Sequence, residues 1–194
     1  MMIIGVGCGP DLITIQAARL IFNARRVAGS QRALDLAEEY IQEDCQVEVL
    51  KDYSRLNELP PDTVLLSTGD PMLAGLRAKD ARYIPGISSL QLAFARLRLP
   101  LDTASVVLAH GRHDRAKCLE DVVRYLREGK NVFMVAAPGF DVKTMATTLK
   151  ANEIDCKMAI CQDLGYPEES IIEGTPSEYP LPTSDLFAIV VGRW

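Results

Sequence analysis

Residues 64–89 read VLLSTGDPMLAGLRAKDARYIPGISS, and we expect this stretch to carry the function of the chain. Its apolar run at residues 64–66 predicts a buried strand that ends in the turn residues 67–71, STGDP. A shorter run at residues 82–84 predicts a second strand, which ends in residues 85–89, PGISS. Open α/β sheets bind ligands at the carboxyl ends of their strands, so we expect these two polar, glycine-bearing turns to form the floor of a pocket.

The chain before this stretch alternates between strand and helix patterns. Apolar residues 2–6 predict a first strand, which leads into a glycine loop, GVGCGPD, at residues 5–11. Thr14 is placed to cap a helix after this loop, and Ser30 to cap a second helix that runs to residue 42. Further strands are expected at residues 26–29 and 46–50, and a short helix at residues 72–79. This alternation favours a parallel sheet.

The glycine loop lacks the residues that mark a nucleotide phosphate site. A dinucleotide-binding loop carries a further glycine and an acidic residue about 20 positions on. Here the strand at residues 26–29 is followed by Ser30 and Gln31. No Lys-Ser or Lys-Thr pair follows the glycines, which excludes a P-loop. Two interpretations stay open for this loop: a tight strand-to-helix turn, or a backbone surface that a ligand approaches closely.

The second half of the chain predicts another α/β unit. Ser88 or Ser89 is placed to cap a helix that Pro100 ends, and a linker at residues 99–102 then divides the chain into two α/β domains, residues 1–101 and 102–194. Strands are expected at residues 105–109, 131–136 and 157–161, and helices at residues 117–128 and 142–149. Residues 170–173 and 186–191 predict a closing pair of antiparallel strands, because no long connection lies between them.

Composition narrows the class of protein. The chain has 194 residues, 48% of them hydrophobic, and a net charge of -5, which argues against nucleic acid as a partner. The five cysteines form no CxxC pair, so we expect neither disulfides nor a zinc site, and a reducing cytoplasmic location. The N-terminus, MMIIGVGCGP, is not typical of a signal peptide, and no apolar run is long enough to span a membrane.

The only histidines, His110 and His113, stand in a basic segment, HGRHDRAK, at residues 110–117. A metal site would need further ligands, and none is near in the sequence, so we expect no metal and a structural or substrate-contacting role for the pair. The segment's cations, which include Arg112, fit either a solvated helix start or a site for a ligand carboxylate.

Several of these segments together resemble the tetrapyrrole methylases, which use S-adenosylmethionine (SAM) to methylate precorrin and porphyrin-like rings. The resemblance rests on GVGCGP at residues 5–10, STGDP at residues 67–71 and PGISSLQLAFARLRLP at residues 85–100. HGR at residues 110–112 and QDLGYPEESIIEG at residues 162–174 are similar to one branch of this family. That branch methylates C5 of cobalt-precorrin-7 in cobalamin biosynthesis.

The resemblance implies two α/β domains with SAM held in the cleft between them. The residues that it implies for SAM binding are Thr68, Gly69, Asp70, Leu73, Ser88, Ser89, Val135, Ala136, Leu164 and Phe187, with Ala188 beside the last. It also implies that the glycine loop faces the tetrapyrrole, which makes Gly7, Cys8, Gly9 and Pro10 substrate-binding residues. Cys8 stands where family members often have proline.

Methyl transfer from a sulfonium depends on desolvation and alignment and needs no covalent catalyst. This suits a chain without a Ser-His-Asp or Cys-His signature. We hypothesise that Arg112 pairs with the acetate and propionate groups of the ring, and that His110 is the catalytic residue that manages a proton. For Ser88 and Ser89, helix capping and SAM contact remain compatible interpretations.

The family also suggests partners. A homodimer is expected, and a separate enzyme for methylation and decarboxylation at C15, because longer members carry that activity as a fused second methyltransferase. Four alternatives stay open: a methylase for a different ring carbon, a diphthine synthase-like enzyme, a dinucleotide-dependent reductase, and a non-catalytic subunit that binds a corrinoid.

Overall fold

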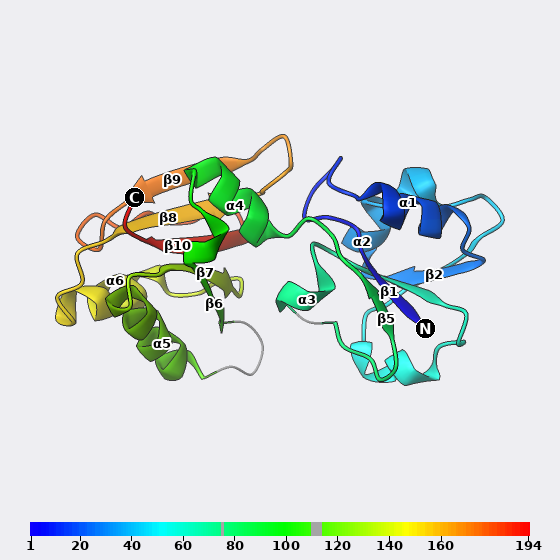
Figure 1. Cartoon of the computed structure of the whole chain (residues 1–194), viewed down its shortest axis with the longest axis horizontal. Helices are drawn as coiled ribbons and strands as arrows, with labels where there is room; N and C mark the ends of the chain where they lie inside the picture. The colour runs from blue at the N-terminus through cyan, green and yellow to red at the C-terminus, as the bar shows by residue number, and fades with distance from the viewer. Residues whose placement is uncertain (75, 110–113) are drawn as a thin grey trace. The chain divides into compact units, whose positions relative to one another are not determined.

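The structure is a computed structural model that describes residues 1–74, 76–109 and 114–194. The chain divides into two compact units, Met1–Ser89 and Leu90–Trp194, and each is built around one five-stranded sheet (Figure 1). This break lies one helix before the domain boundary expected after residue 101, because helix α4 (Ser89–Leu97) belongs almost wholly to the second unit.

The sheet of the first unit is parallel throughout, as the alternating pattern predicts. Its strand order is β3-β2-β4-β1-β5. The strands are β1 (Met2–Gly5), β2 (Arg26–Gly29), β3 (Gln46–Val49), β4 (Val64–Ser67) and β5 (Arg82–Ile84). Because β1 pairs with both β4 and β5, the loops that follow these strands leave the sheet next to one another at its carboxyl edge.

The helices of the first unit are short. They are α1 (Ile15–Phe22), α2 (Gln31–Asp35), α3 (Pro71–Ala74) and the 3₁₀ turns η1 (Glu38–Tyr40) and η2 (Tyr53–Glu58). Thr14 caps α1, because its side-chain oxygen accepts a hydrogen bond from the Ala17 nitrogen at 3.1 Å. Ser30 caps α2 in the same way, with the Ala33 nitrogen at 3.2 Å. The single helix predicted from Ser30 to residue 42 is wrong: α2 ends early and η1 follows. An i, i+3 spacing of apolar residues fits a 3₁₀ turn as well as an α-helix, so the pattern could not separate them.

Both faces of the first sheet are covered. On one face Ile4 and Leu66 pack with Ile21 of α1, and on the other Ile3 and Leu65 pack with Leu56. These isoleucines and Leu65 are completely buried. Burial on both faces explains why the strands read as continuous apolar runs.

The sheet of the second unit is mixed, with the order β6-β7-β10-β8-β9. Only β6 and β7 are parallel. The strands are β6 (Ala104–Ala109), β7 (Asn131–Ala136), β8 (Lys157–Gln162), β9 (Ser170–Gly174) and β10 (Phe187–Gly192). Helix α5 (Arg115–Arg127) and helix α6 (Val142–Ala151) pack their apolar sides on this sheet and appear together in Figure 1.

The last two strands do not pair with each other, so the predicted closing pair is wrong in its pairing. Strand β9 pairs with β8, whereas β10 lies between β7 and β8, antiparallel to both. Every residue of β10 is buried, whereas those of β9 are partly or fully exposed. A strand that is apolar on both faces is stabilised by a central position, and a half-polar strand suits an edge.

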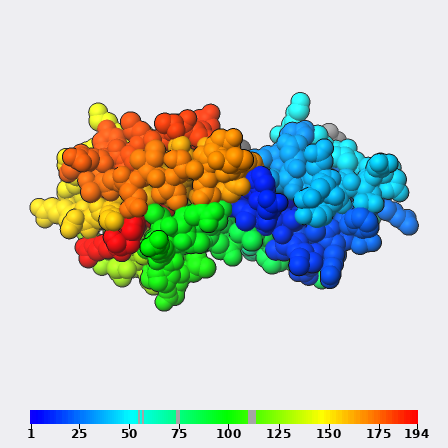
Figure 2. Space-filling model, turned by 90° about the horizontal axis from the view of Figure 1, so that it is seen from above, coloured from blue at the N-terminus to red at the C-terminus, as the bar shows by residue number. Residues whose placement is uncertain are grey.

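The C-terminus is fixed to the second unit. Asn131 accepts a hydrogen bond from the Arg193 nitrogen at 3.0 Å, and its side-chain nitrogen donates to the Thr103 hydroxyl at 2.9 Å. The indole nitrogen of Trp194 donates to Glu173 at 3.1 Å. The last residues, red in Figure 2, reach the surface of this unit.

Candidate functional site

In the first unit, the loops after β4, β1 and β5 meet at a junction of glycines. Gly69 donates a hydrogen bond to the carbonyl of Gly7 at 2.7 Å, and the Gly7 nitrogen lies 3.4 Å from the carbonyl oxygen of Gly69. A Cβ on Gly5 would lie 2.6 Å from both the Gly69 oxygen and the Gly86 nitrogen, and one on Gly86 would overlap that same oxygen. Backbone therefore packs directly on backbone here, and Gly5 and Gly86 leave no room for a side chain.

Gly69, in contrast to Gly5 and Gly86, has room for a side chain. Its φ is +68°, and a Cβ there would lie 3.9 Å from the Ser88 Cα and 4.0 Å from the Cys8 Cβ, which are ordinary contact distances. The space that a side chain would fill at Gly69 is thus bordered by one residue from each of the other two loops. A backbone surface of this kind can accept a ligand at close range.

The remaining residues predicted in this unit lie along the same loops. Asp70 accepts a hydrogen bond from the Met72 nitrogen at 2.7 Å, so one carboxylate oxygen caps the short helix α3. Thr68, Asp70 and Leu73 are partly exposed, Ser88 is buried, and Ser89 begins α4. Gly7, Cys8 and Gly9 are buried and Pro10 is exposed.

In the second unit, the predicted cofactor residues gather at one edge of the sheet. Ala188 at the start of β10 pairs with Val135 near the end of β7 and with Cys161 near the end of β8. Phe187 and Ala188 are buried, and Val135 and Ala136 are half-buried. The antiparallel position of β10 brings these strand ends together.

The turn that carries Leu164 follows β8 at this edge, and its backbone is unusual. Asp163 has a φ of +49° and Gly165 a φ of +83°, while the Leu164 side chain is buried. Such a conformation persists where surrounding contacts enforce it. The Ser184 hydroxyl donates to Asp163 at 2.8 Å, and the Asp163 nitrogen donates to the Leu186 carbonyl at 2.9 Å.

A second set of contacts to this turn comes from Gln162, which the sequence pattern did not single out. Its side chain is buried, donates to the Thr183 hydroxyl at 2.8 Å and accepts from the Thr183 nitrogen at 3.0 Å. A polar residue at the end of an apolar strand is the signal that was available, because a buried amide requires partners. The contacts join the turn to the segment before β10.

Glu169 closes the same turn from the other side. Its carboxylate accepts from the Gly165 nitrogen at 2.8 Å and from the Arg96 guanidinium at 2.5 Å. Partial burial would raise the pKa of Glu169, but the bonds from Arg96 and Gly165 outweigh it and leave this pKa below its ordinary value. Local sequence patterns give no sign of this pair, because the two residues are far apart along the chain.

The predicted catalytic residue His110 and the predicted substrate residue Arg112 lie outside the described residues, as does His113. The strand before them, β6, ends at Ala109, which pairs with Ala136 at the edge described above. After them, Asp114 caps α5 through bonds from the Ala116 and Lys117 nitrogens at 2.9 and 3.4 Å. Arg115 and Lys117 are exposed.

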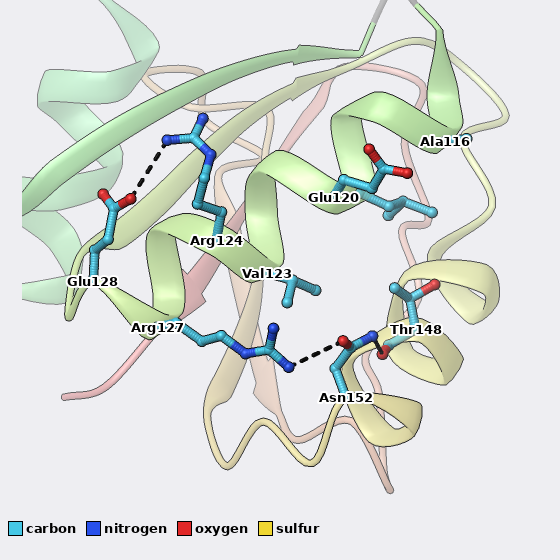
Figure 3. Close-up of a pocket in the computed structure, with 9 residues that line it drawn as sticks. Ala116, Glu120, Val123, Arg124, Arg127, Glu128, Thr148 and Asn152 are labelled. Carbon is cyan, nitrogen blue, oxygen red and sulfur yellow. Dashed lines mark hydrogen bonds and ion pairs between the residues drawn. The ribbon is translucent and has the colours of Figure 1, made fainter.

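A separate pocket of about 600 Å³ lies on the outer side of α5 and α6 (Figure 3). It contains none of the residues predicted from the sequence to bind a ligand. Polar side chains that line it contact one another: Arg127 donates a hydrogen bond to Asn152 at 3.1 Å, and Arg124 forms an ion pair with Glu128 at 3.5 Å.

Across the part of the chain that the structure describes, no helix is both long and apolar enough to cross a membrane.

Solved structures share this two-unit architecture. The precorrin-6Y methylase of Archaeoglobus fulgidus superposes with a TM-score of 0.76 at 27% identity, over 100% of this chain and 98% of that one. The methyltransferase CobJ gives 0.80 at 16% identity over 99% and 93%, and a diphthine synthase gives 0.72 at 17% identity over 100% and 90%. At such low identity these last two show the fold alone.

Comparisons of the sequence with known proteins identify the family as well as the fold. The profile of the Tetrapyrrole (Corrin/Porphyrin) Methylases matches residues 1–180, and the chain belongs to this family. A relative from Methanocaldococcus jannaschii, "Probable cobalt-precorrin-7 C(5)-methyltransferase", is 31% identical over 87% of this chain and 86% of its own length. A Sinorhizobium precorrin-6Y C(5,15)-methyltransferase (decarboxylating) is 26% identical over 86% of this chain, which spans only 43% of that protein.

Membership makes this chain a methyltransferase whose methyl donor is SAM, and it sets aside the dinucleotide-dependent reductase. The residues present fit such a donor. A cofactor that combines an adenosine with an amino acid needs backbone groups and small polar side chains at close range, and the space bordered by Gly69, Cys8 and Ser88 offers these.

Proposed function

We propose that this chain transfers the methyl group of SAM to C5 of cobalt-precorrin-7, a step of cobalamin biosynthesis. The relative of that name is matched over most of its length and most of this chain. The structural observation that carries the proposal is the glycine junction, where the loops after β4, β1 and β5 meet without side chains between them.

In the first unit, we assign SAM contacts to the STGDP turn after β4 and the PGISS turn after β5. The proximity of Ser88 to Gly69 supports a shared surface for these turns. The proposed SAM-binding residues here are Thr68, Gly69, Asp70, Leu73, Ser88 and Ser89. In the second unit they are Val135, Ala136, Leu164 and Phe187, and their assembly at one sheet edge supports the assignment.

The tetrapyrrole is assigned to the glycine loop, through Gly7, Cys8, Gly9 and Pro10, and to Arg112. Gly7 and Gly9 have no side chains, which supports contact through backbone rather than through long side chains. A guanidinium suits the acetate and propionate groups of the ring because it binds carboxylates in a bidentate manner. His110 is proposed to accept a proton.

The reaction needs little from acid–base groups. The sulfonium supplies an electrophilic methyl group, and a meso carbon of a reduced tetrapyrrole is already nucleophilic. The protein therefore has to align the two carbons and exclude water. Buried apolar residues at the proposed cofactor edge, such as Leu164 and Phe187, are suited to that exclusion.

We also propose that the enzyme works as a cytoplasmic homodimer beside a separate C15-methylating and decarboxylating enzyme. The Sinorhizobium relative is named a C(5,15)-methyltransferase (decarboxylating), and this name supports C15 methylation and decarboxylation as the activity of such a partner.

The decisive experiment is incubation of the purified chain with isotope-labelled SAM and a panel of precorrins, with and without cobalt. We expect one methyl group to be added to cobalt-precorrin-7, with its position at C5 established by mass spectrometry and NMR. A methyl group at another carbon would reassign the regiochemistry. Binding of the ring without any transfer would instead support a non-catalytic corrinoid-binding subunit.

A further inference from the structure

The turn at Leu164 needs external support, and Glu169 is placed to provide it. Asp163 and Gly165, which flank Leu164, both have positive φ values of +49° and +83°. Left-handed backbone at a non-glycine residue is unfavourable without compensating contacts. The Gly165 nitrogen, in the middle of this strained segment, is bound by the Glu169 carboxylate at 2.8 Å.

Glu169 is itself held by a residue from another element. Arg96 of α4 contacts it through two nitrogens, at 2.5 Å from Nε and 3.5 Å from Nη2. The Glu169 side chain is 19% exposed and that of Arg96 49% exposed, so water screens the pair only in part. A charge-assisted contact of this geometry fixes direction as well as distance.

The pair links two segments that the proposed function uses. Helix α4 begins at Ser89, the last residue of PGISS, and Arg96 lies on its last turn. Glu169 lies on the same short segment as Leu164. One helix and one ion pair therefore connect a residue assigned to SAM with the turn that carries another.

We propose that Arg96 and Glu169 are positioning residues for SAM: they hold the Leu164 turn in its cofactor-binding conformation without touching the cofactor. This inference rests on the proposed function. Other groups near Glu169 do not replace Arg96. The neighbouring Glu168 is exposed and has the same charge as Glu169. Burial, and to a smaller extent the negative charge of Glu169, raise the pKa of the Cys161 thiol on β8, so this thiol is neutral and cannot pair with the carboxylate.

The test uses the full chain and the variants Glu169→Ala, Glu169→Gln, Arg96→Gln and Arg96→Lys. SAM binding is measured by isothermal titration, and KM and kcat by methyl transfer. We expect Glu169→Ala and Arg96→Gln to raise the Kd and KM for SAM by roughly threefold to tenfold, with kcat and the KM for the tetrapyrrole almost unchanged. Glu169→Gln keeps an acceptor for Gly165 and should show a smaller effect, and Arg96→Lys should restore most of the affinity.

Hydrogen exchange gives a second readout that needs no ligand. The Gly165 amide should exchange faster in Glu169→Ala than in the wild type, whereas the exposed Glu168→Ala and Arg98→Gln should behave as the wild type in every assay. If the wild type binds SAM and Glu169→Ala binds it equally well, the positioning role is wrong. It is also wrong if Glu169→Ala shows a lower kcat together with higher KM values for both SAM and the tetrapyrrole. Absence of binding by the wild type at millimolar SAM would overturn the proposed function, and this inference with it.

Discussion

The backbone of Gly69 in the GDP turn pairs antiparallel with that of Gly7 in the first loop, although the strands that lead to these loops run parallel. The nitrogen of Gly69 donates to the carbonyl of Gly7 at 2.7 Å. Gly69 and Gly7 have positive φ values of +68° and +84°, so each of the two loops turns back toward the other as it leaves the sheet. This pairing holds the cofactor-side turn and the substrate-side loop of the proposed function at a fixed distance.

Gly86→Ala should destabilise the protein severely. The new methyl group would overlap the Gly69 carbonyl and lie 2.8 Å from the Gly5 carbonyl carbon, and backbone atoms cannot move aside as side-chain ends can. We expect a loss of about 2–4 kcal/mol in the free energy of unfolding, measured by urea denaturation. Gly129→Ala, with a φ of +76° and nothing within 4 Å, is the control and should lose about 1 kcal/mol. Equal losses would show that the junction is not tightly packed.

Gly69→Ala should separate binding from stability. Its methyl group meets no atom closer than 3.9 Å, so only the positive φ costs stability, and the loss should match that of Gly129→Ala at about 1 kcal/mol. The same methyl group would fill the space assigned to SAM. We expect the Kd for SAM in isothermal titration to rise at least roughly tenfold, the effect of a blocked close contact. Unchanged affinity would move the cofactor away from Gly69.

The stabilisation that Glu169 gives should disappear in acid. Its pKa is lowered in the folded state, so its contribution is present above the unfolded value of about 4.3 and is lost as the pH falls through the lower, folded value. Because Arg96 is half exposed, the contribution is modest, about 0.5–1 kcal/mol. The difference in Tm between wild type and Glu169→Gln should be visible at about pH 6 and should shrink steadily as the pH is lowered below about 4. A difference that grows in acid would contradict the assigned sign.

The cysteines should react with iodoacetamide in a defined order. Burial raises the pKa of Cys161 to about 12 and that of Cys156 to about 11, so neither supplies much thiolate at neutral pH. Burial also raises the pKa of Cys45, but its side chain is partly exposed, whereas the other four cysteines are buried. Mass spectrometry of the native protein at about pH 8 should find Cys45 alkylated first. Labelling of Cys161 at the same rate would mean that β8 opens readily; unfolded protein, in which all five react, is the control.

Arg112→Ala should weaken tetrapyrrole binding and leave SAM binding intact, because a guanidinium that binds ring carboxylates has no part in holding the cofactor. The loss of a charge-assisted pair predicts a rise in the KM for the ring of roughly tenfold or more. Arg115→Ala, on the exposed first turn of α5, is the control for charge alone. An equal loss of SAM affinity would show that Arg112 has a different role.

Local patterns were sufficient where one signal decided one element. The apolar runs before STGDP and PGISS predicted β4 and β5, and Thr14 and Ser30 predicted the starts of α1 and α2. They were insufficient where two structures share a spacing, as for the 3₁₀ turn η1, and where the partner of a strand had to be chosen. Strand β10 was expected beside β9, but its complete burial places it in the centre of the sheet.

Sequence patterns were enough to identify the class of the fold and the family, and they led us to propose the turns at which a ligand binds, because each follows from residues close together along the chain. Which turns touch one another depends on how the strands are arranged in space. The order β4-β1-β5 brings Gly5, Gly69 and Gly86 into contact, and the path of β10 brings Val135 beside Ala188. Strand order and the Arg96–Glu169 pair arise from packing between distant segments, and local propensity contains no record of those distances.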